Sequence, residues 1–93
     1  MLIFSLKKEW YEKIKSGEKT IEYREVKDYW TIRLCSTIYF LKQGKERHCF
    51  FQIGYNPKTR ISALISKIEI VDGINTDLKI DKKVYAIHFR LEE

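Results

Sequence analysis

The spacing of apolar residues changes its period along the chain, and each change marks the end of one predicted element. Residues 2–6 form a short apolar run that is typical of a strand. Between residues 6 and 14 apolar side chains recur every three or four positions, which predicts an amphipathic helix. We expect Ser5 to cap the start of this helix and Gly17 to end it.

A strand with two unlike faces is predicted to follow the helix. From Thr20 the pattern alternates with a period of two, so that Ile21 and Tyr23 share one face. Thr20, Glu22 and Arg24 share the opposite, polar face. This alternation predicts a half-buried strand.

The middle of the chain is predicted to contain a short helix and two strands. Residues 27–34 favour a short helix or turn, and residues 37–42 are interpreted as a strand. Gly44 is expected to form a hairpin turn into a further strand at residues 48–55. Residues 54–59 are then predicted to form a loop.

The last third of the chain contains a phase change that bears on the overall fold. Ile61 and Ile65 have one parity, whereas Ile68 and Ile70 have the other, and such a slip predicts a β-bulge. Bulges bend strands around a closed sheet, and a last strand is expected at residues 84–91. We therefore predict an α+β, mostly β fold: a small β-barrel with one or two short helices.

Composition limits the chain to one domain and one core. It has 93 residues, of which 44% are hydrophobic and 14% aromatic, enough to fill a core without a disulfide or a metal. The apolar start is interrupted by charges from Lys7 onwards, unlike a signal peptide, and the apolar stretch at residues 34–41 is too short for a membrane span. We predict a single cytoplasmic domain over residues 1–93, with no membrane partner.

The two cysteines are expected to be buried free thiols. Cys35 and Cys49 are widely spaced and belong to no CxxC pair. A zinc site would require both to converge with His48 and His88, yet the neighbours His48 and Cys49 would point to opposite faces of a strand. We therefore predict neither a metal site nor a cofactor.

The net charge of +5 is concentrated in the middle of the chain. Residues 42–60 contain five basic residues and one acidic residue, Glu46. Such a local excess attracts phosphates, although it is equally compatible with an ordinary soluble surface. The basic residues, all candidate ligand contacts, are Lys42, Lys45, Arg47, Lys58 and Arg60.

Three charged residues close to the predicted helix end are the main candidates for chemistry. Glu22 and Arg24 are two positions apart in a predicted strand, about 7 Å along the backbone on one face. Lys19 comes from the turn beside them. The pattern fits a site with one shared ligand, and it also fits an ordinary solvated strand face.

Gly17, Lys19, Glu22 and Arg24 form the pattern GxKxxExR, which resembles the signature of the ASCH domain, a member of the PUA-like superfamily. The resemblance covers most of the chain and implies a barrel of five or six strands with helices over its ends. It also implies a cleft, lined by the signature residues, that binds RNA or a nucleotide-like ligand. Further similar segments lie at residues 29–30, 51–55 and 85–89.

Within such a cleft each charged residue has an expected role. Arg24 is suited to bind a phosphate with two hydrogen bonds, and Lys19 to act as a point charge. Glu22 would orient both cations or accept a hydrogen bond from a base amino group. Trp30 and Tyr55 lie next to turns and basic residues and are the candidates for stacking on a base.

An enzyme is the alternative hypothesis. One branch of the family hydrolyses acylated cytidine with a lysine, a threonine and a glutamate; here Lys19 would be the lysine, and Glu22 occupies the position of the threonine. Lys19 and Glu22 are therefore the catalytic candidates for hydrolysis of a modified nucleoside or, second, of RNA. A carboxylate beside Lys19 favours its ammonium form, which suits a fixed donor better than a base. A protein-interaction module is a third possibility.

Overall fold

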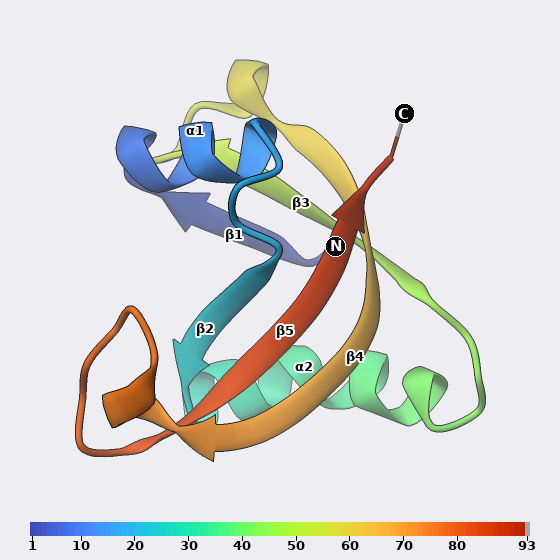
Figure 1. Cartoon of the computed structure of the whole chain (residues 1–93). Helices are drawn as coiled ribbons and strands as arrows, with labels where there is room; N and C mark the ends of the chain where they lie inside the picture. The colour runs from blue at the N-terminus through green and yellow to red at the C-terminus, as the bar shows by residue number, and fades with distance from the viewer. Residues whose placement is uncertain (93) are drawn as a thin grey trace.

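The computed structural model describes residues 1–92, which form one mixed sheet and two helices (Figure 1). The five strands of the sheet have the order β1-β3-β4-β5-β2; β1 runs parallel to β3, and the other pairs are antiparallel. The elements are β1 (Ile3–Leu6), α1 (Lys8–Lys15), β2 (Ile21–Glu25), α2 (Asp28–Leu41), β3 (Arg47–Ile53), η1 (Pro57–Thr59), β4 (Ile61–Asp72), η2 (Gly73–Asn75) and β5 (Lys83–Leu91).

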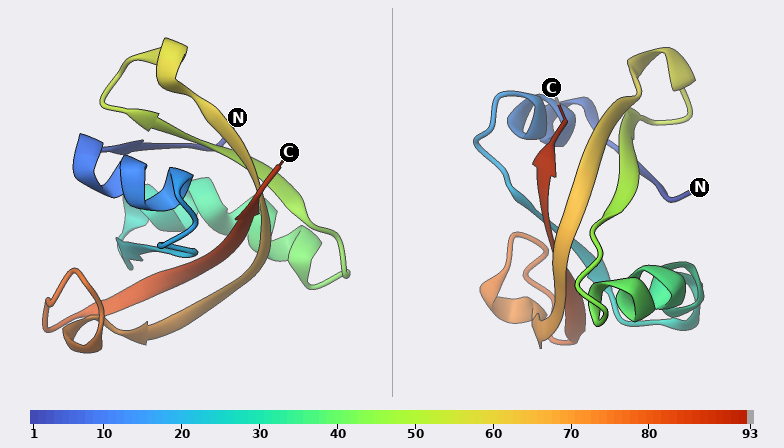
Figure 2. Two further views of the ribbon diagram at one scale, coloured as in Figure 1. Left: turned by 45° about the horizontal axis from the view of Figure 1, so that its top comes forward. Right: turned by 90° about the vertical axis from the view of Figure 1, so that its right-hand side faces the viewer.

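The fold is α+β, as predicted, but the sheet is not closed. The strands β1 and β2 are its two edges and do not pair with each other within residues 1–92. The predicted bulge is confirmed, because the register between β4 and β5 shifts between Ile65 and Lys67. It lies in a long, strongly curved strand that pairs with β3 through its first half and with β5 through most of its length (Figure 2). The sheet is thus curved at the bulge, but its two edge strands do not form a hydrogen-bonded pair in the described part of the chain.

The helix α1 ends as the sequence predicts and begins differently. Gly17 has a φ of +85°, a conformation that glycine adopts without strain, and its N–H donates to the carbonyl of Ile14 at 3.1 Å. The backbone N–H of Lys19 then donates to the carbonyl of Lys13 at 3.0 Å, which turns the chain into β2. The N-terminal capping position is Lys7 and not Ser5, because Ser5 still belongs to β1, where it pairs with Gln52 of β3.

The helix α2 is longer than predicted and replaces a predicted strand. Residues 37–42 are interpreted as a strand from the sequence, yet α2 continues to Leu41. Their β-branched and aromatic side chains favour strands locally. Trp30, Leu34 and Thr37 are buried at helical spacing, so packing against the sheet outweighs the local preference. Gly44, with a φ of +76°, consequently turns a helix into β3 and is not part of a hairpin between strands.

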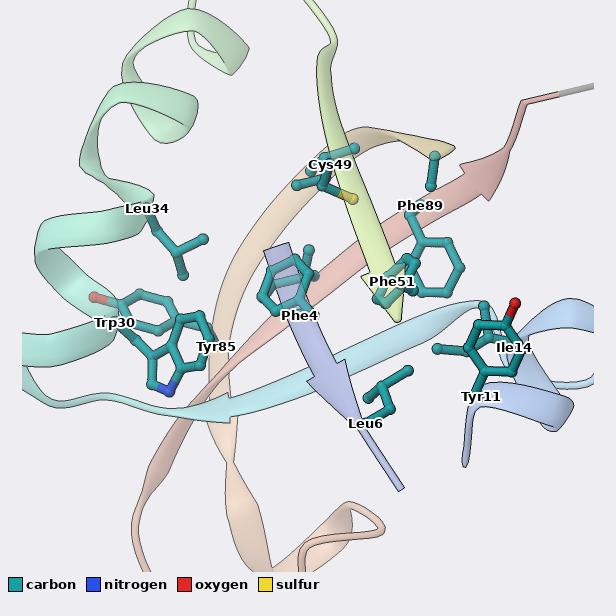
Figure 3. Packing of buried hydrophobic residues seen from close by; sticks show 13 residues of the cluster. Phe4, Leu6, Tyr11, Ile14, Trp30, Leu34, Cys49, Phe51, Tyr85 and Phe89 are labelled. Carbon is teal, nitrogen blue, oxygen red and sulfur yellow. The ribbon is translucent and has the colours of Figure 1, made fainter. Parts of the chain in front are cut away.

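The core lies on the concave side of the sheet, between the two helices. Its rings contact in series: Phe4 and Trp30 have centroids 5.4 Å apart, Phe4 and Phe51 5.4 Å, and Phe51 and Phe89 4.6 Å. Figure 3 shows this series extending from Trp30 on α2 to the side chain of Ile14 on α1. A continuous aromatic core therefore fixes the distance between the helices.

The cysteines differ from each other in environment. Cys49 is fully buried in the core, and burial raises the pKa of its thiol to about 12, which keeps it protonated and unreactive at neutral pH. Cys35 lies on the exposed face of α2, so the prediction that both thiols are buried is wrong for this residue. Within residues 1–92 no three His, Cys, Asp or Glu side chains are grouped to hold a metal ion. Neither helix in this part of the chain combines the length and the apolar character needed to cross a membrane.

Candidate ligand-binding cleft

The polar face of β2 points toward the core side of the sheet. Glu22 is opposite Ile87 in the antiparallel ladder with β5, and Arg24 is opposite Tyr85. Directly paired residues project on the same side, so both charges share a face with two buried side chains. Glu22 is only 5% exposed, and it is the one buried residue of β2. A solvated strand face, the alternative from the sequence, is therefore wrong.

Glu22 connects the two cations of the signature. Its Oε2 accepts from Nε of Arg24 at 2.8 Å and lies 2.7 Å from Nη2. Its Oε1 lies 3.5 Å from Nζ of Lys19. The side chains of Lys19, Glu22 and Arg24 are 9%, 7% and 20% exposed, so this is a largely buried network of charges. A charged group in such surroundings is destabilising unless it is paired, and each member here is paired.

Arg24 also joins the two edges of the sheet. Its Nη2 donates to the backbone carbonyl of Ser5 on β1 at 3.2 Å. The guanidinium carbon lies 4.7 Å from the ring centroid of Trp30 and 5.2 Å from that of Phe4. The side chain therefore spans the opening between β2 and β1 and packs on the end of the aromatic core.

Lys19 is fixed from three sides. Its Nζ donates to Oδ2 of Asp77, in the loop between η2 and β5, at 2.6 Å, a shorter contact than the one to Glu22. The ammonium also lies 5.4 Å from the ring centroid of Trp10 and 5.2 Å from that of Tyr23. Cation–π contacts of this length attract an ammonium group to the ring faces and help to hold it in place. The helix end, the strand and a distant loop thus converge on one ammonium group.

These residues line one cleft of about 500 Å³ between the edges of the sheet. This volume is in the range of pockets that hold small organic ligands. Lys19, Glu22 and Arg24 lie on its wall together with the predicted candidate Trp30. Sequence reasoning missed the other lining residues, among them Lys7, Trp10, Tyr23, Glu25, Lys27 and Asp77.

The cleft retains hydrogen-bond donors that the protein itself does not use. Nη1 of Arg24 has no acceptor among residues 1–92, and Lys19 has three donor hydrogens for two carboxylates. No side-chain nitrogen or oxygen buried from solvent in this part of the chain lacks a partner, so Nη1 is accessible. The two N–H donors of Nη1 and one ammonium hydrogen therefore remain for a ligand that carries acceptor oxygens.

The two aromatic candidates from the sequence have unlike positions. Trp30 lines the cleft but is only 8% exposed, and Arg24 and Phe4 pack against its ring. Tyr55 is 93% exposed in the turn after β3 and lies outside the cleft. Trp10 and Tyr23 also line the cleft and are more exposed than Trp30, with the ammonium of Lys19 over both rings and that of Lys13 over Trp10.

The basic residues between positions 42 and 60 do not line this cleft. Arg47 lines a separate groove, and Arg60 donates from Nε and Nη2 to Oε1 of Gln52 at 3.1 and 3.0 Å. These residues were predicted to share one role, whereas the structure distributes them over more than one surface. Those that lie outside the cleft are Lys42, Lys45, Arg47, Lys58 and Arg60.

Comparisons of the chain with protein-family models, with curated proteins and with solved structures gave no match.

Proposed function

We propose that the chain is an ASCH-type, PUA-like domain that binds RNA or a nucleotide-like ligand in the cleft between β1 and β2. One observation carries this proposal: Lys19 and Arg24, both paired with the buried Glu22, line a single cleft and keep unused donors. Buried charge networks in a cleft are more common at functional sites than elsewhere, because a hydrophobic replacement would stabilise the fold equally well or better.

The donors match a phosphate better than a neutral ligand. A guanidinium and an ammonium group together supply charge-assisted hydrogen bonds, the strongest kind available to phosphate oxygens. Glu22 and Asp77 prevent a large excess of positive charge and hold the cations in fixed positions. The half-buried rings of Trp10 and Tyr23 line the same cleft beside Lys19 and are the candidates for contact with a base.

The open sheet is compatible with the PUA-like assignment, which we retain as part of this proposal. Strands β1 and β2 approach each other closely enough for Arg24 to bond with Ser5, although they do not pair. The incomplete closure leaves the space that forms the cleft. A ligand phosphate would therefore lie at the junction that a closed barrel would fill with backbone hydrogen bonds.

Hydrolysis of an acylated nucleoside has weaker support. Asp77 supplies a second carboxylate near Lys19, as that chemistry would need, but Glu22 stands where the related hydrolases have a threonine. The ammonium of Lys19 lies between two carboxylates, an arrangement that favours a hydrogen-bond donor over a base. Binding without hydrolysis is the simpler function for this arrangement.

The salt dependence of RNA binding tests the proposed function. We expect a fluorescein-labelled single-stranded octauridylate to bind with log affinity falling against log salt, by about 0.7 for each phosphate neutralised. Lys19 and Arg24 keep unused donors in the cleft, and when both neutralise phosphates the slope should be at least as steep as about −1.4. Fluorescence anisotropy between about 50 and 200 mM salt measures it. A bound oligonucleotide whose affinity is independent of salt would contradict phosphate recognition.

A further inference from the structure

A groove separate from the cleft lies at the start of β1, whereas the cleft lies at the end of this strand. The cations of the groove have no acidic partner among residues 1–92, unlike Lys19 and Arg24 in the cleft. The groove has a volume of about 650 Å³ and is lined by Met1 and Leu2, by Ile3 at the start of β1, by α2, and by the segment that leads into β3 and the first residues of that strand. Arg33 from α2 and Arg47 from β3 both lie on its wall. The two arginines are 14 residues apart in sequence, and the turn from α2 into β3 brings them to one surface.

These two arginines are held by aromatic rings and not by carboxylates. The guanidinium carbon of Arg33 lies 3.4 Å from the ring centroid of Tyr29, and that of Arg47 lies 4.2 Å from the ring centroid of Phe40. Nη1 of Arg33 also donates to the backbone carbonyl of Tyr29 at 2.9 Å. Neither guanidinium forms an ion pair with an acidic residue of positions 1–92, so both are oriented but not neutralised.

The guanidinium groups of the other three arginines already donate hydrogen bonds to side chains of the protein. Arg24 pairs with Glu22, and Arg60 donates twice to Gln52. Arg90 forms two hydrogen bonds with Glu46, the one acidic residue that lines the groove. These bonds hold the pKa of Glu46 below its ordinary value, so this carboxylate is ionised. Its negative charge is balanced by Arg90 and not by the cations of the groove. The positive charge of Arg33 and Arg47 is therefore not compensated within the groove.

The groove also offers groups that suit a nucleotide. Ser36 supplies an exposed hydroxyl, and Phe50 presents a half-buried ring on the same wall. Lys45 lies 5.9 Å from the ring centroid of Phe40, beside Arg47, and adds a third cation nearby. Uncompensated guanidinium groups beside an aromatic face are typical of surfaces that bind single-stranded nucleic acid.

The groove and the cleft border the same two segments, the N-terminal stretch and α2. Residues 1–3 line the groove, whereas Ser5 and Leu6 line the cleft, so both sites border one stretch of six residues, about 17 Å long when extended. On α2, Trp30 lines the cleft and Arg33, one turn further, lines the groove. A chain of a few linked nucleotides is therefore long enough to occupy both sites, whereas a mononucleotide is not.

We propose that this groove is a second phosphate subsite, in which Arg33 and Arg47 bind the backbone of a single RNA strand that enters the cleft. This inference rests on the proposed function and narrows its ligand class from a nucleotide to an oligonucleotide. It also assigns a role to Arg47, which belongs to the basic segment at residues 42–60 and lies outside the cleft.

Two double variants with equal loss of charge test the subsite. Arg33→Gln/Arg47→Gln removes the groove cations, and Lys58→Gln/Lys67→Gln removes two exposed lysines that line neither site. We expect the groove variant to bind octauridylate at least about tenfold more weakly and to reduce its salt slope by about 1.4, while uridine monophosphate binds as to the wild type. The lysine variant should change the octauridylate affinity by less than about threefold.

The outcomes separate this inference from the proposed function. If uridine monophosphate and octauridylate bind the wild type, and the groove variant retains the affinity and slope for octauridylate, the subsite is wrong and the cleft proposal stands. If neither probe binds the wild type, both proposals are wrong. If the groove variant loses affinity for polyglutamate and not for octauridylate, the groove is a site for acidic protein segments, and the subsite is again wrong.

Discussion

Replacing Arg24 with alanine is expected to lower the free energy of unfolding by about 3 kcal/mol, because the change leaves a buried carboxylate without its closest partner. Glu22 would keep only the 3.5 Å contact with Lys19, and the bond from Arg24 to the carbonyl of Ser5 would be lost. For a domain of this size the melting temperature should fall by roughly 15 °C. Thermal unfolding followed by circular dichroism measures the change.

The pair between Arg90 and Glu46 provides the matched control. It is also an arginine–glutamate pair, but both side chains are exposed, at 59% and 39%. Ion pairs in water add little to stability, so Arg90→Ala should melt close to the wild type. If Arg24→Ala also melts like the wild type, Glu22 is solvated in solution, and the buried network described above does not exist.

Replacing Lys19 with alanine is expected to weaken binding of octauridylate by about 10- to 100-fold, because it removes the cleft ammonium that is paired with Glu22 and keeps a free donor for a phosphate. Asp77→Asn should have the opposite effect and strengthen binding severalfold. Asp77 is the closest acceptor of Lys19 and competes with a phosphate for its hydrogens. Fluorescence anisotropy of both variants measures these changes, and their melting curves confirm that each is folded.

The double variant Lys19→Ala/Asp77→Asn tests whether the two effects share one cause. If Asp77 acts by occupying Lys19, its replacement gives no gain once the lysine is absent, so the two changes are not additive. A loss of affinity in Asp77→Asn alone would contradict this account. That result would mean that Asp77 contacts the ligand directly or positions Lys19 for it.

Local signals in the sequence were sufficient for much of the fold. Gly17 was identified as a helix end from its place after the apolar pattern, and its φ of +85° explains why glycine is required there. The parity change between Ile65 and Ile68 predicted the bulge, which the register shift confirms. The last strand, β5, was predicted within one residue of its observed start. These features depend on residues that are near neighbours in the chain.

The second helix could not be predicted in full because its packing partners are distant in sequence. Residues 37–42 combine β-branched and aromatic side chains that favour strands locally. Leu34 and Thr37 are buried only because α2 packs against the sheet, which no local pattern records. Ile32 and Tyr39, 69% and 59% exposed, further obscured the helical pattern by placing large apolar side chains on the outer face.

The charged residues of the candidate site were predicted from the sequence, but their burial and their contact with a distant loop were not. The spacing of Lys19, Glu22 and Arg24 indicated that three charges meet, and the structure brings them into one network. Polar residues in an alternating strand normally face solvent, so their position on the core side was not predicted. Asp77 is 58 residues from Lys19 in sequence and carries no local signal of their contact.

The two tryptophans allow the most direct test of the cleft as the ligand site. The chain contains only Trp10 and Trp30, and both line the cleft. In a ¹H–¹⁵N correlation spectrum their indole N–H groups therefore give two isolated signals from the site. We expect both signals to shift as octauridylate is added, with the dissociation constant that anisotropy gives. Saturation of the protein with octauridylate while both indole signals stay unchanged would show that the RNA binds elsewhere and would contradict the account.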